Sequence, residues 1–492
     1  MNTKKQEIPS IKKRMLIGLA AGLYPFLHYY SNNFNIADSW EQISFMVALC
    51  LLAPMAVALL LPMIFRFGLL QRLQKYVLTV FNLVAFTLLL SLLIFHFKNM
   101  LLLGILSGIG LASLVAYRFL SKIVLIQLLL AVMSLITLVP KLIFVFTYDD
   151  SWKVISENIS EVKLKKTPNI YLIQPDGYAN FSELRRASYN DQDTTFENWL
   201  TQEGFVNYPD CRSNYFNTLT SNSSAFAMKH HFYGNINPNN EKTQDAMEDI
   251  VGENNALTIL NNNNYTTHLF TDNSFFLLNR KLKAYDYCNI SKSELPFYKL
   301  GKLPNVDILS DFKSKLEAQP KGPNFFFIEK ITPGHIKNLK MGSGGIAKER
   351  EKYLLGIQQA NVWLTSLIEL INEHDDNPLI IIMADHGGSV GLEYSSELKE
   401  RTLNAAETAS VFSVLLSVKW PDGTAPEDLS FKTNVNLFRN VFYHLSNDER
   451  LMKSYQPDIS YLYNLANGPM EVYQCIDENG KYGYIKVEEK QD

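Results

Sequence analysis

The hydrophobic positions of the chain are concentrated in its N-terminal part. Before Asp149, long apolar runs are separated by short polar loops, and the interiors of these runs carry almost no charge. A helix needs about 20 apolar residues to cross the roughly 30 Å of hydrocarbon in a bilayer. The pattern therefore predicts membrane-spanning helices at Met15–Tyr30, Ile43–Phe65, Tyr76–Phe97, Met100–Tyr117 and Ile123–Phe146, five in all.

Positive charges alternate between the loops that join these spans. Lys and Arg residues precede the first span and occupy the second-to-third and fourth-to-fifth connections, whereas the other two loops hold few cations. Because cytoplasmic loops carry the excess of Lys and Arg, we expect the N-terminus in the cytoplasm. Five crossings then place everything after Asp149 outside it. The expected parts are a transmembrane domain (1–148), a polar linker (149–167) and an extracytoplasmic domain (168–492).

After the linker, short apolar runs alternate with helical patterns. Such alternation predicts an α/β domain in which helices flank a mostly parallel central sheet. The expected strands are Asn169–Ile173, Thr266–Phe270, Asn324–Ile328, Leu379–Met383 and Val411–Val418. The expected helices include Phe196–Glu203, Ala256–Asn262, Lys348–Glu373 and Asn434–Leu445.

Composition changes this picture little. The formal net charge is -3 and the chain has no long basic run, so nothing indicates nucleic-acid binding. The C-terminal domain has an odd number of cysteines, Cys211, Cys288 and Cys475, which leaves one disulfide open without deciding its pairing. No CxxC pair indicates a structural zinc site.

Three of the expected strands are followed by carboxylates or histidines. Asp176 follows the first strand, Glu329 and His335 follow the third, and Asp385 and His386 follow the fourth. Ligands gather at the carboxyl ends of parallel strands, and an adjacent Asp and His can place two donors on one cation. Simpler interpretations exist, because an Asp-Gly pair is commonly a turn, while Glu329 and His335 could be surface loop residues.

Three segments of the C-terminal domain carry a further signal: the strand ending in Asp176-Gly177, the stretch Arg212-Ser213-Asn214-Tyr215-Phe216-Asn217-Thr218, and the strand ending in Asp385-His386-Gly387. Together they resemble the alkaline phosphatase and sulfatase superfamily, in its membrane-anchored branch. Their order and separations fit nearly the whole domain. Five spans before an external catalytic domain also match the layout of lipoteichoic-acid synthases and phosphoethanolamine transferases.

The resemblance implies a site with one divalent cation, Mn²⁺ or Zn²⁺, held by Asp176, Thr218, Asp385 and His386. A threonine hydroxyl becomes an effective nucleophile when a cation lowers its pKa, so we expect Thr218 to attack phosphorus and form a covalent phospho-enzyme. Register against the preceding Ser-Asn-Tyr favours Thr218. Most of the neighbouring hydroxyls are expected to serve helix capping; they belong to Thr220, Ser221, Ser223 and Ser224.

His335 resembles the superfamily's substrate-contacting histidine and would be the acid that protonates the leaving group. The other expected substrate contacts are Arg212, Asn214, His230, His231 and Glu329.

The chain also departs from the superfamily pattern. Cys211 lacks the motif that sulfatases convert to formylglycine, which disfavours sulfate-ester hydrolysis. Only His444 follows His386, so a one-metal site is preferred over a two-metal site. His335 is one residue from the usual Pro-His position, and Glu329 stands where a histidine is common.

The expected function is the transfer of a phosphoglycerol- or phosphoethanolamine-like substituent from a membrane lipid donor to an envelope glycan or glycolipid. By resemblance, the location is a bacterial inner membrane. A phosphodiesterase, a phosphatase or a sulfatase-like hydrolase would use the same residues with a different acceptor. A non-catalytic accessory of polysaccharide export is the alternative from another class.

Overall fold

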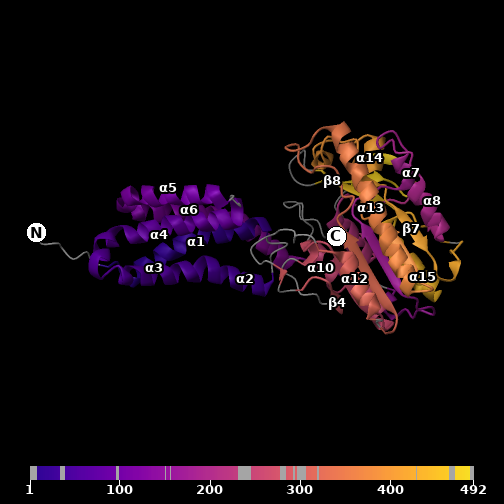
Figure 1. Ribbon diagram of the computed structural model, residues 1–492, viewed down its shortest axis with the longest axis horizontal. Coiled ribbons are helices and arrows are strands. Elements are labelled where there is room, and N and C mark those ends of the chain that lie inside the picture. The colour runs from indigo at the N-terminus through magenta and orange to yellow at the C-terminus, as the bar shows by residue number, and fades with distance from the viewer. Residues whose placement is uncertain are drawn as a thin grey trace, which may run out of the picture. The chain divides into compact units, whose positions relative to one another are not determined.

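The computed structural model describes residues 8–33, 39–95, 99–149, 151–155, 157–230, 245–277, 284–291, 294–295, 306–318, 321–427, 429–464 and 471–487. Contacts between Cα atoms divide these residues into two compact units, one ending at Tyr148 and the other beginning at Asp149 (Figure 1). Each unit has its own buried apolar cluster. The two units are therefore described separately.

Within the described residues, the N-terminal unit has helices in each of the five predicted spans. Its helices are α1 (Ile11–Asn33), α2 (Trp40–Val47), α3 (Ala53–Ile64), α4 (Gln74–Leu90), α5 (Asn99–Ala116) and α6 (Leu120–Thr147). One π-helical turn, Ala48–Leu52, joins α2 to α3, and another, Ser91–Phe95, extends α4.

In the described part of the chain, four helical stretches are long and apolar enough to cross a membrane. Three lie in the N-terminal unit: Trp40–Ile64, Leu70–Ile94 and Asn99–Thr147. The last of these contains two predicted spans joined by a short 3-10 turn at Tyr117–Phe119. The fourth is α13 (Ile346–His374), whose apolar face is buried in the other unit. A membrane anchor is thus supported, whereas five crossings and their orientation stay predictions.

Two glycines let α1 lie close to the helix that follows it. A Cβ atom on Gly22 would lie 1.5 Å from the carbonyl oxygen of Cys50, and one on Gly18 would lie 2.6 Å from Cα of Met55. Small residues four positions apart allow such close packing between membrane helices. The N-terminal unit is therefore a packed bundle.

The C-terminal unit is built on a seven-stranded sheet with the order β2-β7-β6-β1-β5-β3-β4. The strands are β1 (Ile170–Pro175), β2 (Phe205–Asn207), β3 (Thr266–Thr271), β4 (Tyr287–Cys288), β5 (Asn324–Lys330), β6 (Leu379–Met383) and β7 (Leu416–Lys419). The strands from β6 to β4 in this order pair in parallel, whereas β7 is antiparallel to both β6 and β2. The prediction of a mostly parallel sheet is confirmed.

Helices cover both faces of this sheet. Successive side chains of a strand point to opposite faces, and in β5 the rings of Phe325 and Phe327 contact Phe438 and Phe226, while Phe326 contacts Phe312. The helices are α7 (Phe181–Leu184), α8 (Thr195–Gln202), α9 (Thr218–Ala227), α10 (Ala246–Val251), α11 (Asn255–Asn262), α12 (Ile308–Glu317), α13, α14 (Ala405–Phe412), α15 (Leu437–Ser446) and α16 (Arg450–Lys453). The result is a three-layer α/β/α arrangement.

The predicted strand Val411–Val418 is wrong in its first part. Val411 and Phe412 end α14, and the strand begins at Leu416. The helix starts at a capping box, in which the Asn404 side chain accepts from the Glu407 backbone and the Glu407 side chain accepts from Asn404 N. This cap extends helical structure into a β-branched, apolar run.

A second sheet follows near the C-terminus, and the sequence did not indicate it. It consists of the antiparallel strands β8 (Ser460–Asn464), β9 (Glu471–Ile476) and β10 (Tyr482–Lys486). The three cysteines of the unit, Cys211, Cys288 and Cys475, are free thiols. The predicted linker also packs onto this unit, because Ile159, Val162 and Leu164 join its apolar cluster.

Candidate metal and catalytic site

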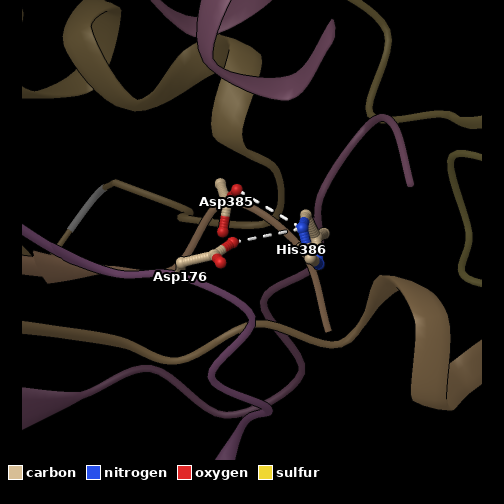
Figure 2. Close-up of side chains that lie close together, drawn as sticks. All are labelled: Asp176, Asp385 and His386. Atoms are coloured by element: carbon tan, nitrogen blue, oxygen red, sulfur yellow. Dashed lines mark ion pairs between the residues drawn. The ribbon is translucent and has the colours of Figure 1, made fainter. Parts of the chain in front are cut away.

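Two adjacent parallel strands bring the predicted ligands together. Strands β1 and β6 pair directly, with Ile173 opposite Ile382, so the residues that follow them emerge at the same edge of the sheet. Asp176, Asp385 and His386 lie there, all buried, with one ligand atom of each within 4.8 Å of the others. Figure 2 shows the two carboxylates next to each other with His386 beside both. Its Nε2 lies 3.3 Å from Asp176 Oδ1 and 3.5 Å from Asp385 Oδ2. These three residues are called the triad below.

The turn after β1 requires glycine. Gly177 has a φ of +71°, and a Cβ atom there would lie 2.5 Å from the carbonyl oxygen of Gly334. The backbone N–H of Gly177 donates to Asp385 Oδ1 at 3.0 Å, and Gly334 N donates to Asp176 O at 2.8 Å. The Asp-Gly pair is therefore a turn, as the simpler interpretation holds, and it also orients both carboxylates of the triad.

Thr218 is the first residue of α9, next to the triad. Asn217 caps this helix by accepting a hydrogen bond from Thr220 N. Thr218 Oγ1 donates to Asp176 Oδ1 at 3.3 Å and lies 3.3 Å from His386 Nε2. Its side chain is half-buried and lines a cavity of about 260 Å³. The hydroxyl thus faces both the triad and the opening through which a substrate would enter.

The neighbouring hydroxyls have other partners. Ser221 Oγ donates to the carbonyl of Asp385, Ser223 Oγ to that of Leu219, and Ser224 Oγ to that of Ser221. Thr220 Oγ1 donates to the Asn217 side chain at 3.0 Å. Among the described hydroxyls of this segment, that of Thr218 is the one bonded to side chains of the triad, whereas Ser221 bonds a backbone carbonyl of it.

The charges of the triad shift one another's pKa values. Burial opposes ionisation of Asp176, but the hydrogen bond and charge of His386 outweigh it and lower the pKa of Asp176 to about 2. Burial raises the pKa of Asp385 to about 6, despite the nearby His386. Burial disfavours the charged form of His386, yet Asp385 and Asp176 raise its pKa to about 10. These shifts favour the charged form of His386 beside an ionised Asp176.

The donor set fits a divalent cation. Asp385 Oδ2 is buried and has no hydrogen-bond partner within the described ranges, and a buried carboxylate oxygen without a partner is costly. His386 Nδ1 lies 2.9 Å from the carbonyl of Gly387, so Nδ1 carries a hydrogen and Nε2 faces the carboxylates. Two carboxylates, an imidazole and a hydroxyl suit Mn²⁺ or Zn²⁺. A cation would satisfy the unpaired oxygen and displace the His386 proton.

His335 lies at the same site. Its exposed ring has its centroid 5.7 Å from that of His386, and it lines the cavity beside Thr218. His335 Nδ1 is 2.5 Å from the carbonyl of Ile336, so this nitrogen is the donor to the backbone. Its Nε2 is then the atom with which it could exchange a proton with a substrate.

Glu329 is a buried residue rather than a surface turn. Its Oε2 accepts hydrogen bonds from Thr271 Oγ1 at 2.6 Å and from Asn273 Nδ2 at 3.0 Å. Burial raises the pKa of Glu329 well above its ordinary value, and the charges of Asp176 and Asp385 add to this. Glu329 braces the ends of β5 and β3 through these hydrogen bonds, and its predicted substrate contact stays a prediction.

Three further predicted substrate contacts bind backbone carbonyls instead of facing the triad. Arg212 donates to the carbonyls of Asp458 and Asp477, Asn214 donates to that of Ile459, and His230 Nε2 lies 2.8 Å from that of Pro457. None of the three is among the described residues that line the cavity beside Thr218. His231 lies outside the described residues. Their substrate roles stay predictions.

Sequence reasoning missed the residues that hold the triad in place. Tyr353 of α13 donates to Gly177 O at 2.8 Å and accepts from Ala179 N at 3.0 Å, so it fixes the turn after Asp176. Asn434 donates to the carbonyls of Ala384 and Asp385. No local pattern distinguishes a tyrosine or an asparagine with such a role from its neighbours.

No protein-family model matches the chain, and no curated protein matches it. Solved structures do. The C-terminal periplasmic domain of EcEptC from Escherichia coli is 13% identical, covers 65% of this chain and 93% of its own, and gives a TM-score of 0.42. The integral membrane lipooligosaccharide phosphoethanolamine transferase A (EptA) from Neisseria meningitidis is 12% identical, covers 90% and 97%, and gives 0.38. The putative sulfatase yidJ from Bacteroides fragilis is 13% identical, covers 66% and 90%, and gives 0.40. Each of these is a structure to which part of this chain is similar.

Proposed function

We propose that the chain is a membrane-anchored, metal-dependent phosphotransferase whose nucleophile is Thr218. The observation that carries this proposal is the position of the Thr218 hydroxyl, 3.3 Å from both Asp176 Oδ1 and His386 Nε2. A hydroxyl at the start of a helix, beside two buried carboxylates of which one oxygen, Asp385 Oδ2, accepts no hydrogen bond within the described ranges, has the neighbours that a cation-activated nucleophile needs.

Asp176, Thr218, Asp385 and His386 would hold one divalent cation. When bound, it would lower the pKa of the Thr218 hydroxyl and offset the charge of a phosphoryl group. The remaining work falls to the chain itself. The first-turn N–H groups of α9 are donors for anionic oxygens, and Lys399, which lines the same cavity, adds a positive charge.

In the first half of the reaction, Thr218 Oγ, after giving up its proton to solvent, would form a bond to the phosphorus of a phosphodiester. The bond from phosphorus to the leaving alcohol would break, and His335 would supply the proton that this alcohol takes up. In the second half, the hydroxyl of an acceptor would attack the phosphothreonine and release Thr218, and its proton would return to His335. Charge stabilisation and positioning dominate such a transfer, which suits a site built from buried charges.

We further propose that the donor is a membrane phospholipid and the acceptor an envelope glycan or glycolipid, reached on the extracytoplasmic side of a bacterial inner membrane. The transferred group would be phosphoglycerol or phosphoethanolamine. Support for this comes from the apolar helices that precede the catalytic unit and from the charge distribution among their loops. A lipid donor is also chemically suited to a compartment in which ATP is scarce.

The test is turnover by the full chain in nanodiscs that contain labelled phosphatidylglycerol or phosphatidylethanolamine, with Mn²⁺ or Zn²⁺ added after chelation. We expect metal-dependent release of diacylglycerol that is lost in Thr218→Ala, while Ser224→Ala, a matched buried hydroxyl on the same helix, keeps its activity. Product that appears only as the free head group would assign a hydrolase. No metal-dependent turnover of any phosphodiester would support the non-catalytic alternative.

A further inference from the structure

The loop between β5 and α13 presents apolar side chains to solvent. Met341 is 91% exposed and Leu339 is 60% exposed, and Ile346 at the start of α13 is 52% exposed. Lys337 and Lys340 alternate with the first two, and both are exposed. A single exposed leucine is ordinary, but large apolar side chains interleaved with lysines are typical of segments that lie at a membrane interface.

Hydrogen bonds hold this loop in its exposed conformation. The buried carboxylate of Glu349 accepts from Lys337 N at 3.0 Å and from Gly344 N at 2.9 Å, which ties both ends of the loop to α13. Asn338 accepts from Ser395 Oγ at 3.1 Å through its side chain and from Ser396 Oγ at 2.6 Å through its carbonyl. The loop is fixed at its base while Leu339 and Met341 project from its tip.

The same loop borders the cavity beside Thr218. Asn338 and His335 line this cavity. On another part of the rim, Phe275 also lines it and is 37% exposed. The exposed apolar residues Leu339 and Met341 thus belong to a loop that also contributes lining residues to the cavity of the proposed reaction.

A short segment of chain tethers the C-terminal unit to the apolar helices that precede it. Helix α6 ends at Thr147, and Lys153, six residues later, is already fixed on the C-terminal unit by an ion pair to Asp249 at 2.6 Å and a hydrogen bond from Asn255. Six residues span about 20 Å at most. So short a tether gives a high effective concentration of lipid around the C-terminal unit. Lipid is therefore the apolar partner that we assign to the loop.

We propose that Leu339 and Met341 insert into the interfacial layer of the bilayer that carries the N-terminal helices. Lys337 and Lys340 would lie at the level of the lipid phosphates, where cationic side chains with long apolar stems are favourable. Lys340 has Glu393 as a neighbour at 3.7 Å, but an exposed pair of this kind is weak and leaves the lysine available to phosphates. The mouth of the cavity would then open among lipid head groups.

Fluorescence quenching by lipid tests the contact directly. The full chain, with the half-buried Cys288 replaced by serine, carries an environment-sensitive fluorophore at Met341→Cys in nanodiscs of phosphatidylglycerol and phosphatidylcholine. Val362→Cys is the matched control, because Val362 is an apolar residue of α13 with 70% exposure, 16 residues after Ile346 and about 24 Å along the helix axis. We expect shallow spin-labelled lipids to quench position 341 several-fold more than position 362. Equal quenching at the two positions would overturn the proposal.

If the proposed function holds, insertion of the loop should help the enzyme to use a lipid donor. A second measurement tests this consequence separately from the insertion itself. The double variant Leu339→Ser/Met341→Ser should lose turnover of a bilayer-embedded donor several-fold while keeping turnover of a short-chain, water-soluble phosphodiester. Equal loss on both substrates would contradict a role in membrane contact. If the wild type turns over neither substrate, the proposed function fails, whereas the quenching experiment still decides whether the loop enters the bilayer.

Discussion

Removal of one hydroxyl, in Tyr353→Phe, should weaken metal binding at a site that Tyr353 does not touch. This hydroxyl donates to Gly177 O at 2.8 Å and accepts from Ala179 N at 3.0 Å, and the side chain is 3% exposed. Neither backbone group has another hydrogen-bond partner among the described residues. The variant therefore leaves two buried polar groups unpaired, at a cost of about 2–4 kcal/mol after partial relaxation.

The turn can relieve part of this cost by moving, and the triad would move with it. Gly177 follows Asp176 in the chain and its N–H donates to Asp385 Oδ1, so a shift of the turn displaces both carboxylates. If about 1.4–2.8 kcal/mol of this cost appears as lost free energy of metal binding, the affinity for the metal falls by about 10–100-fold. The affinity of the chelator-stripped protein for Zn²⁺, measured by competition with a chromophoric chelator, reports this loss.

The control is Tyr265→Phe. Tyr265 is also buried and donates to the carbonyl of Pro168 at 2.9 Å, at the end of the sheet away from the triad. Both variants should unfold at lower denaturant concentration, but Tyr265→Phe should keep its metal affinity. Equal affinities in the two variants would refute the argument that the Tyr353 hydroxyl positions the carboxylates through the Gly177 turn.

Three further outcomes follow from the same geometry. The pKa of Asp385 is raised to about 6 and that of His386 to about 10, so the group that must still lose a proton at pH 8 to bind a metal is His386. Calorimetry in buffers of different ionisation enthalpy should therefore count about one proton released on metal binding. The metal affinity should rise between pH 7 and pH 9. Glu329→Gln should keep metal affinity within about twofold at pH 7, because the buried glutamic acid is already neutral, and a tenfold loss would show that it acts as a charge. Gly387→Ala should lower the unfolding free energy by about 1–3 kcal/mol and abolish metal binding, because the added Cβ would lie 2.1 Å from the carbonyl oxygen of Ser410. A variant whose denaturation and metal titration curves match those of the wild type would contradict this.

Much of the C-terminal fold follows from the sequence, because its central strands are buried on both faces. Every residue of β1 and β6 is buried, so each strand reads as a continuous apolar run with a clear end. Asp176 is the first residue after β1 and Asp385 the second residue after β6, and the pairing of the two parallel strands brings them together. Their proximity was therefore predictable from the positions of the runs.

Other elements gave no such signal. Strand β2 has only three residues, and every residue of β10 is exposed or half-buried, so neither carries an apolar pattern that marks a strand. Arg212 was expected at the substrate because it shares a segment with Thr218, yet its guanidinium donates to the carbonyl of Asp477. Sequence proximity does not determine the direction of a long side chain, which depends on contacts with residues far along the chain.

The most direct test of the central claim is the detection of a covalent intermediate on Thr218. The full chain would be incubated with the phospholipid donor and Mn²⁺ or Zn²⁺ without acceptor, quenched in acid, digested and analysed by mass spectrometry. We expect phosphoglycerol or phosphoethanolamine on the peptide that contains Thr218, with no adduct in Thr218→Val or in chelator-treated protein. Robust metal-dependent turnover without an adduct at Thr218, or an adduct at another hydroxyl, would contradict the account.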